Sequence, residues 1–252
     1  MLKPNKIDLV QLSPEWHEYR EKGIGSSDAS IISGHLPEAW DSMFALSTYK
    51  ITGSSRTFDE VGLARITRGQ ELEPVAREEY IRLTGNVVEP GCFIHPEFDF
   101  IRASLDGITE DFKIITEIKC SGDNVYNKVV EGEIPDYYYA QMQHQLACVP
   151  GSEKVDFVMF DPDKGTIIYE VFPDLEFISE LLRREEVFWR NVLKKKKLYG
   201  GQLGKKIPIN AKRNLIYPLE GASIEETPST PESQTPPVES QEATNAESES
   251  GI

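Results

Sequence analysis

The stretch SLDGITEDFKIITEIKC, residues 104–120, constrains the fold of this chain more than any other segment. Apolar residues dominate its two ends, and the segment ITEDFK between them is about as long as a hairpin connection. Antiparallel pairing of two such strands would bring Asp106 beside Glu117. Alternation along the second strand puts Glu117 and Lys119 on one face. We also expect Gly107 to allow a sharp turn directly after Asp106. The segment therefore predicts a strand pair that carries two acids and a lysine into an apolar setting.

Two explanations fit the charged side chains of this segment, because such groups are costly to bury unless each has a partner or a metal ion. One is a surface hairpin with an ordinary Glu–Lys pair, since Asp…Glu-x-Lys alone is a weak pattern. The other is a metal site, because close carboxylates repel unless a cation lies between them. Mg²⁺ accepts carboxylate and phosphate oxygens, and a nearby lysine can orient or deprotonate water and neutralise phosphate charge. The apolar flanks, and the further acid Glu73 on a preceding helix, favour the site.

Composition bounds the class of protein. The 252 residues suffice for one large domain or two small ones, and 39% of them are apolar. No apolar run approaches the roughly 20 residues that span a membrane, and the N-terminal segment lacks an apolar signal region. The three cysteines lie far apart, which is typical of a reducing, cytoplasmic location and argues against a zinc or iron–sulfur site. The four histidines show no ligand spacing, so we assign them no chemistry and expect a structural role for His144.

The charge is unevenly distributed. Residues 220–252 carry eight of the 42 acids and none of the 27 bases, so the net charge of the rest is −7 rather than −15. This segment is rich in Pro, Ser, Thr and Glu and cannot bury enough apolar surface to fold alone, so we expect a domain over 1–219 and a disordered tail over 220–252. Basic residues cluster at 194–197 and at 205, 206, 212 and 213. They form either a solvated helix end or a rim that contacts phosphates.

The order of predicted elements indicates an α+β fold. Helices are expected at 13–24, with Ser13 as N-cap, at 26–34, capped by Ser26 or Ser27, and at 68–85, ended by Gly85. Two more are expected at 136–149 and 174–197. Strands are expected at 91–95, 98–105, 113–120, 154–162 and 165–173.

Asp-Gly followed by Glu-Ile-Lys on the next strand resembles the PD-(D/E)xK nuclease pattern. Six segments in order are similar to the YqaJ-type viral recombinases, or lambda exonuclease family: WHEYREKGIGSSDAS, RGQELEPVAREEY, SLDGI, EIKC, YYYAQMQHQL and FVMFDPD. They lie within roughly residues 12–200. The family pattern has Pro before the Asp, where this chain has Leu105. The resemblance implies a restriction-endonuclease-like core, an α/β/α arrangement with a mixed central sheet flanked by helices.

For the metal site, the resemblance implies that Asp106, Glu117 and the backbone carbonyl of Ile118 are ligands. Lys119 would position or activate the attacking water. Glu73 matches a helical glutamate that supports the metal and the nucleophile. Without the resemblance, Glu73 is equally explained as an acid favoured near a helix start.

For the substrate, the resemblance implies that Arg20 and Ser27 hold the 5′-phosphate of the digested strand. A guanidinium fork and a hydroxyl near a helix N-terminus suit a phosphate, although a solvated helix charge also explains Arg20. Ser104 and Gln141 match polar residues around the scissile phosphate and the metal-bound waters. Gln141 and Gln145 share one helical face, and Gln143 points elsewhere.

The function implied by the resemblance is a Mg²⁺-dependent 5′-to-3′ exonuclease on linear duplex DNA, with Mn²⁺ able to replace Mg²⁺. It would leave a 3′ single-stranded tail, act as a homotrimer, hand the strand to a single-strand annealing protein and be encoded by a phage or prophage in a bacterial host. Two alternatives stay open. One is another nuclease of this fold, Cas4-like, RecB-like or an endonuclease, although the iron–sulfur members need four cysteines. The other is a non-catalytic DNA-binding scaffold, against which the intact Asp106, Glu117 and Lys119 argue.

Overall fold

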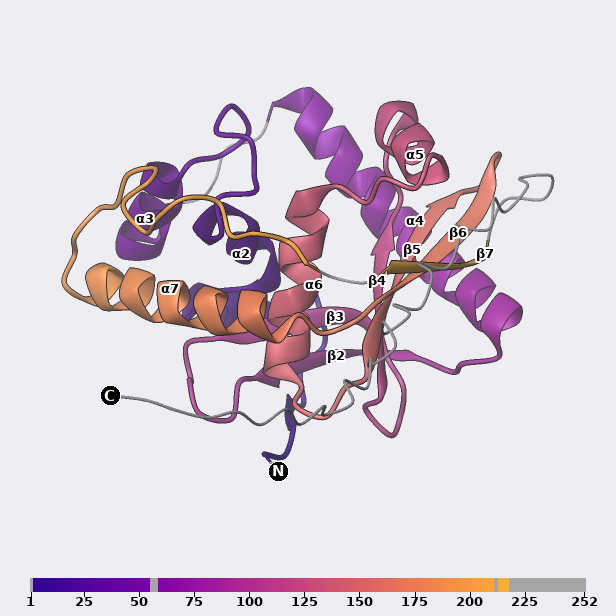
Figure 1. The fold of residues 1–252 in the computed structure, drawn as a ribbon, viewed down its shortest axis with the longest axis horizontal. Coiled ribbons are helices and arrows are strands. Elements are labelled where there is room, and N and C mark those ends of the chain that lie inside the picture. Colours follow the sequence, from indigo (N-terminus) through magenta and orange to yellow (C-terminus); the bar gives the residue numbers. More distant parts are fainter. Residues whose placement is uncertain (1, 55–58, 211–212, 218–252) are drawn as a thin grey trace, which may run out of the picture. The chain divides into compact units, whose positions relative to one another are not determined.

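The computed structural model describes residues 2–54, 59–210 and 213–217 (Figure 1). The expected acidic tail, 220–252, lies outside these residues. The helices are α1 (Pro14–Glu21), α2 (Ser26–Ile32), α3 (Met43–Thr52), α4 (Glu60–Thr84), α5 (Asp123–Val130), α6 (Asp136–Cys148) and α7 (Leu175–Leu193). The strands are β1 (Asn5–Ile7), β2 (Glu89–Ile94), β3 (Arg102–Ile108), β4 (Ile114–Lys119), β5 (Lys154–Asp161), β6 (Gly165–Val171) and β7 (Arg213–Tyr217).

The strands form one sheet in the order β1-β2-β3-β4-β5-β6-β7. Only β4 and β5 run parallel, and every other neighbouring pair is antiparallel. The parallel pair is possible because α5 and α6 provide the long crossover that such strands need. The mixed sheet with flanking helices confirms the predicted α+β class.

Local signals set several helix ends as predicted. Ser13 caps α1 by accepting a hydrogen bond from the Trp16 amide at 3.2 Å, and Gly85 ends α4 in the left-handed conformation. The cap of α2 was predicted wrongly. It is Gly25, whose amide donates to the Asp28 side chain at 3.0 Å, so an acid inside the first turn does the capping.

Other elements extend beyond the sequence prediction. Helix α4 begins at Glu60, more than two turns before the expected start, and the short elements β1, α3, α5 and β7 were not predicted. Strand β3 runs on to Ile108, so Asp106 lies within it rather than at its end.

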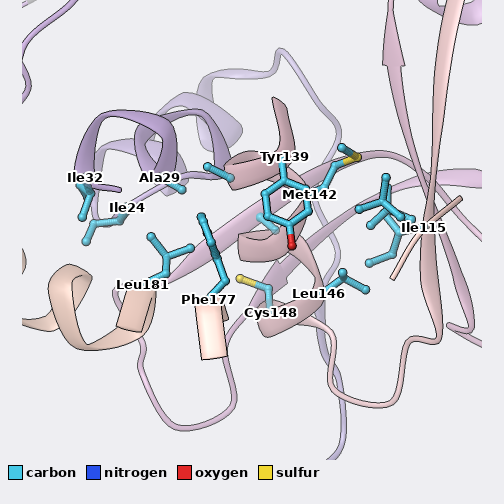
Figure 2. Close-up of a cluster of buried hydrophobic side chains, with 14 of the residues drawn as sticks. Ile24, Ala29, Ile32, Ile115, Tyr139, Met142, Leu146, Cys148, Phe177 and Leu181 are labelled. Carbon is cyan, nitrogen blue, oxygen red and sulfur yellow. The ribbon is translucent and has the colours of Figure 1, made fainter. Parts of the chain in front are cut away.

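Helices cover both faces of the sheet. On one face, Ala76 and Tyr80 of α4 pack with Ile118 of β4 and Val158 of β5. On the other, α6 packs against β3, β4 and β5, and α7 meets α6 at a steep angle and extends away from the strands (Figure 1). Figure 2 shows the core on this side, where side chains of α2, α6 and α7 meet, including Ala29, Tyr139 and Phe177. No helix in the described part of the chain is both long and apolar enough to cross a membrane.

Gly107 has a different role from the one predicted. Its backbone continues the strand, so it makes no turn after Asp106. A Cβ atom at this position would lie 2.2 Å from Thr116 Oγ1 and 2.9 Å from Val88 Cγ2. Gly107 is therefore required because β3 and β4 approach too closely for a side chain.

Candidate active site

The candidate site lies where β3 and β4 separate. The two strands pair only at Gly107 with Thr116 and at Ile108 with Ile115. Beyond these pairs the Ile118 amide donates instead to Asp106 Oδ2 at 2.8 Å. The structure thus brings Asp106 to the Glu117–Lys119 segment, as the hairpin spacing predicted. Strand β4 stays paired with β5 over its whole length, which holds this segment in place.

Glu117 is fully buried and has three side-chain donors. Lys119 Nζ forms an ion pair with Glu117 Oε1, which also accepts from Gln141 Nε2 at 2.6 Å. Gln145 Nε2 donates to Glu117 Oε2. Both amides come from α6, one turn apart, so this helix holds the carboxylate from the side opposite α4. Gln145 was not predicted as a site residue, although its place on the same helical face as Gln141 was a usable signal.

The charges of the site perturb one another. Burial raises the pKa of Asp106 well above its usual range, and the negative charge of Glu117 raises it further. Burial disfavours the ammonium form of Lys119, but the carboxylates of Glu117 and Asp106 outweigh it and raise the pKa of Lys119. Lys119 is therefore a cation that donates to Glu117.

Glu73 reaches the site from α4 through Arg77. Arg77 forms an ion pair with Glu73 one turn away, and its Nε donates to the backbone carbonyl of Asp106 at 2.7 Å. Burial raises the pKa of Glu73, although the charge of Arg77 partly offsets this. Arg77, which the sequence reasoning missed, links the helix to the strand that carries Asp106. Its spacing of four from Glu73 was the only signal.

The donor set fits a hard divalent cation. It consists of oxygen atoms only: two carboxylates, Asp106 and Glu117, and the carbonyl of Ile118. Burial and the negative charge of Glu117 disfavour the ionised form of Asp106. A bound dication would offset the repulsion between the two carboxylates. Within the described ranges no three His, Cys, Asp or Glu side chains gather into a metal cage. Two carboxylates leave the open positions that Mg²⁺ fills with water and phosphate oxygens.

The predicted substrate residues lie together on one side of Asp106. Arg20 Nη2 donates to Ser27 Oγ at 3.3 Å, and its guanidinium lies 4.6 Å from the centre of the Trp16 ring. Trp16 Nε1 donates to Ser104 Oγ at 2.7 Å. Trp16 therefore connects Arg20 to Ser104 and holds both in place.

A buried ion pair stabilises the N-terminal turn of α2. Lys50 of α3 lies 2.9 Å from Asp28, and their side chains are 3% and 7% exposed. Lys50 also donates to the carbonyl of Gly23 at 2.6 Å. Since Asp28 caps α2 through Gly25, this pair fixes the backbone beside Ser27.

Two cavities meet at the site and share Gln70, Glu73 and Asp106. The smaller one, about 190 Å³, is lined by all four predicted substrate residues, Arg20, Ser27, Ser104 and Gln141. The larger one, about 930 Å³, is lined by Ile118 and Lys119. Asp106 and Glu73 therefore stand between the two.

His144 and two residues of the basic cluster, which the sequence analysis also considered, form contacts within the protein. His144 is fully buried, with Nδ1 2.7 Å from Glu185 Oε1 and Nε2 2.9 Å from the Arg102 carbonyl, which fits the structural role expected for it. In the basic cluster, Lys206 pairs with Asp136 at 2.5 Å, and Arg213 donates to the Ile134 carbonyl at 3.3 Å.

Comparisons with known proteins identify the family and the fold. The family described as YqaJ-like viral recombinase domain matches residues 15–153, more than half of the chain. The uncharacterized protein YqaJ of Bacillus subtilis (strain 168) is 31% identical over 191 residues, which cover 75% of this chain and 57% of that protein. The chain thus spans little more than half the length of this relative.

Solved structures show the same likeness. The alkaline exonuclease LHK-Exo from Laribacter hongkongensis is similar with a TM-score of 0.62 and 28% identity, over 73% of this chain and 94% of that one. LHK-Exo in complex with dAMP gives a TM-score of 0.63 with the same identity and coverage. The family match and these likenesses confirm the resemblance that the sequence motifs indicated: the chain belongs to the YqaJ-like viral recombinase family.

Proposed function

We propose that this protein is a Mg²⁺-dependent exonuclease that digests the 5′-ended strand of linear duplex DNA and leaves a 3′ single-stranded tail for annealing-type recombination. The observation that carries the proposal is the convergence of Asp106, Glu117 and Lys119 where β3 and β4 separate. The likeness to an alkaline exonuclease supports the class of reaction. We assign the activity to the domain over 1–219.

In this proposal Asp106, Glu117 and the Ile118 carbonyl hold the metal, which when bound polarises the scissile phosphate and lowers the pKa of a water molecule. Lys119 forms an ion pair with Glu117, so we assign it the tasks of positioning or activating that water and neutralising phosphate charge. Glu73, held by Arg77, supports the metal and the water from α4.

The proposed 5′-to-3′ direction of digestion depends on the smaller cavity. Arg20 supplies a guanidinium fork and Ser27 a hydroxyl in the first turn of α2, which together suit a terminal phosphate. Ser104 and Gln141 line the same cavity and would contact the scissile phosphate and metal-bound waters. The solved complex of LHK-Exo with dAMP supports a DNA nucleotide as the kind of ligand that this protein binds.

The homotrimer, the annealing partner and a phage or prophage origin belong to the proposal through the family resemblance alone. Sedimentation or light scattering would test the trimer. Retention of a single-strand annealing protein on the immobilised chain, with and without residues 220–252, would test the partner and the role of the tail.

The central experiment uses the full chain and linear duplex with a phosphate on one 5′ end. With Mg²⁺, and with Mn²⁺ in its place, the phosphorylated strand should be digested from its 5′ end and closed circular DNA left intact. EDTA or Asp106→Ala should abolish digestion. Glu110→Ala is the matched control, because Glu110 is an exposed acid in the same hairpin. Activity that survives Asp106→Ala would refute the assignment, and cleavage of closed circles would favour an endonuclease.

A further inference from the structure

The larger cavity has an aromatic wall, formed by three neighbouring side chains. Trp40 lines it together with Tyr137 and Tyr138 at the start of α6. The ring centres of Trp40 and Tyr137 are 5.4 Å apart, and those of Tyr137 and Tyr138 are 4.4 Å apart. Lys119 Nζ lies 5.2 Å from the centre of the Tyr138 ring. Three neighbouring rings therefore lead from the lysine of the site to Trp40.

Trp40 is unusual because 64% of its surface is exposed, although its ring has an aromatic neighbour. Trp40 and Tyr137 also line the next hollow along the surface, of about 890 Å³. The pair thus stands between two depressions, with ring surface open to a ligand. Flat aromatic surfaces next to a phosphate-binding site are what nucleobases stack on.

Cationic residues line the larger cavity too. They are Arg65 and Arg68 of α4 and, beside Tyr138, Lys119. Arg65 is exposed, and Arg68 is held by Asp161 at 3.0 Å. A groove that carries both cations and aromatic rings is complementary to a single DNA strand, which carries phosphates and bases.

The two cavities set the path of such a strand. If a 5′-phosphate lies beside Arg20 and Ser27 in the smaller cavity, the scissile phosphate lies at Asp106, which both cavities share. The chain then continues into the larger cavity. The nucleotide that follows the scissile phosphate therefore comes next to the aromatic wall.

We propose that the exposed ring of Trp40, against which Tyr137 packs edge-on, forms a stacking platform for the unpaired base of the nucleotide that follows the scissile phosphate. This inference rests on the proposed exonuclease function and adds a base-binding subsite to it. The platform contacts a base face rather than its edges, so it holds any of the four bases with little sequence preference.

The test compares wild type, Trp40→Ala and Trp40→Phe on two 5′-phosphorylated duplexes. One is normal, and the other has an abasic analogue as the second nucleotide from the 5′ end. Single-turnover release of the first nucleotide is measured with Mg²⁺. On the normal duplex, Trp40→Ala should lower the rate at subsaturating enzyme about tenfold, and Trp40→Phe should retain most of it. On the abasic duplex, wild type and Trp40→Ala should be equal.

Tyr199→Ala is the matched control, because Tyr199 is an exposed aromatic residue, 56% exposed, that does not line this cavity. It should behave as wild type on both duplexes. Equal losses for Trp40→Ala on both duplexes would overturn the platform, because they would mean that Trp40 contacts the backbone or a protein segment. The absence of any loss would overturn it as well.

Binding separates this inference from the proposed function. Affinity for a labelled 5′-phosphorylated strand, normal or abasic at the second nucleotide, is measured in EDTA by fluorescence anisotropy. A base-dependent loss of about tenfold in Trp40→Ala supports the platform, and a base-independent result refutes it. Neither result requires cleavage. Failure of wild type to digest the normal duplex would instead refute the exonuclease.

Discussion

Gln145 should tune the metal site without contacting the substrate. It is completely buried, and its amide nitrogen donates to Glu117 Oε2. Its own Oε1 is buried with no hydrogen-bond partner among the described residues. Gln145→Met, a change of similar volume, removes both the donor to the carboxylate and the unpaired oxygen.

Loss of the donor should lower stability, and loss of the unpaired oxygen should raise it. Only loss of the donor affects the metal site. A hydrogen bond to a charged group contributes about 1.5–3 kcal/mol, and an unpaired buried acceptor costs about 1–3 kcal/mol. The free energy of unfolding should therefore change by less than about 2 kcal/mol in either direction. The carboxylate loses one of its three side-chain donors, and loss of such an outer partner typically lowers metal affinity or activity about 10–100-fold.

The assay is the rate of digestion of 5′-phosphorylated duplex as a function of Mg²⁺ concentration, with thermal unfolding of the same samples. Gln143→Met on the same helix is the control, because Gln143 donates to the Phe172 carbonyl at 3.0 Å and accepts from the Asp174 amide at 2.8 Å. That variant should lose stability while its Mg²⁺ dependence stays normal. If Gln145→Met digests DNA like wild type at every Mg²⁺ concentration, the amide does not tune Glu117.

Three further predictions concern other parts of the chain. Lys50→Met should remove the cation that lies 2.9 Å from the buried Asp28 carboxylate, lower stability by about 1.5–3 kcal/mol and reduce the preference for 5′-phosphate over 5′-hydroxyl ends, measured as a ratio of rates, whereas Lys50→Arg should restore part of both. Burial lowers the pKa of His35 to about 4, so the unfolded chain takes up a proton at a higher pH than the folded chain does. The free energy of unfolding, measured by chemical denaturation at each pH, should therefore fall by up to ~3 kcal/mol between pH 6.5 and 4 in wild type. It should fall by less in His35→Gln. Gly107→Ala should lower the free energy of unfolding by at least ~2 kcal/mol, because its Cβ would lie 2.2 Å from Thr116 Oγ1. In the double variant, Thr116→Ala should recover part of this loss, and additive losses would contradict the clash.

Strand alternation and hairpin length predicted the centre of the site because both are local properties. The positions of Glu117 and Lys119 follow from a period of two, and Asp106 follows from the length of the connection. The main helices were predicted for the same reason, since caps and apolar periodicity act within a few residues.

Which atoms the partners of the site contact could not be predicted, because those contacts depend on how distant elements pack. Lys50 comes from α3, whose short sequence has no strong periodic signal, and it reaches Asp28 only in the folded chain. Gln145 and Arg77 contact Glu117 and the Asp106 backbone from opposite faces of the sheet. Gly107 was assigned to a turn because glycine allows many conformations, whereas its close contact with Thr116 depends on strand register.

The ladder between β3 and β4 is short, so the position of Asp106 relative to Glu117 depends on the register of these two strands. Two residue pairs alone favour one alignment of the strands only weakly, and a slip by one residue would turn the side chains of β4 to the wrong faces. In the native alignment Thr116 fills the space that Gly107 leaves open. A slip by one residue would place Asp106 or Ile108 opposite Thr116, and the close fit of Thr116 against Gly107 would be lost. A residue with no side chain and no part in the chemistry thus favours the register in which Asp106 and Glu117 meet.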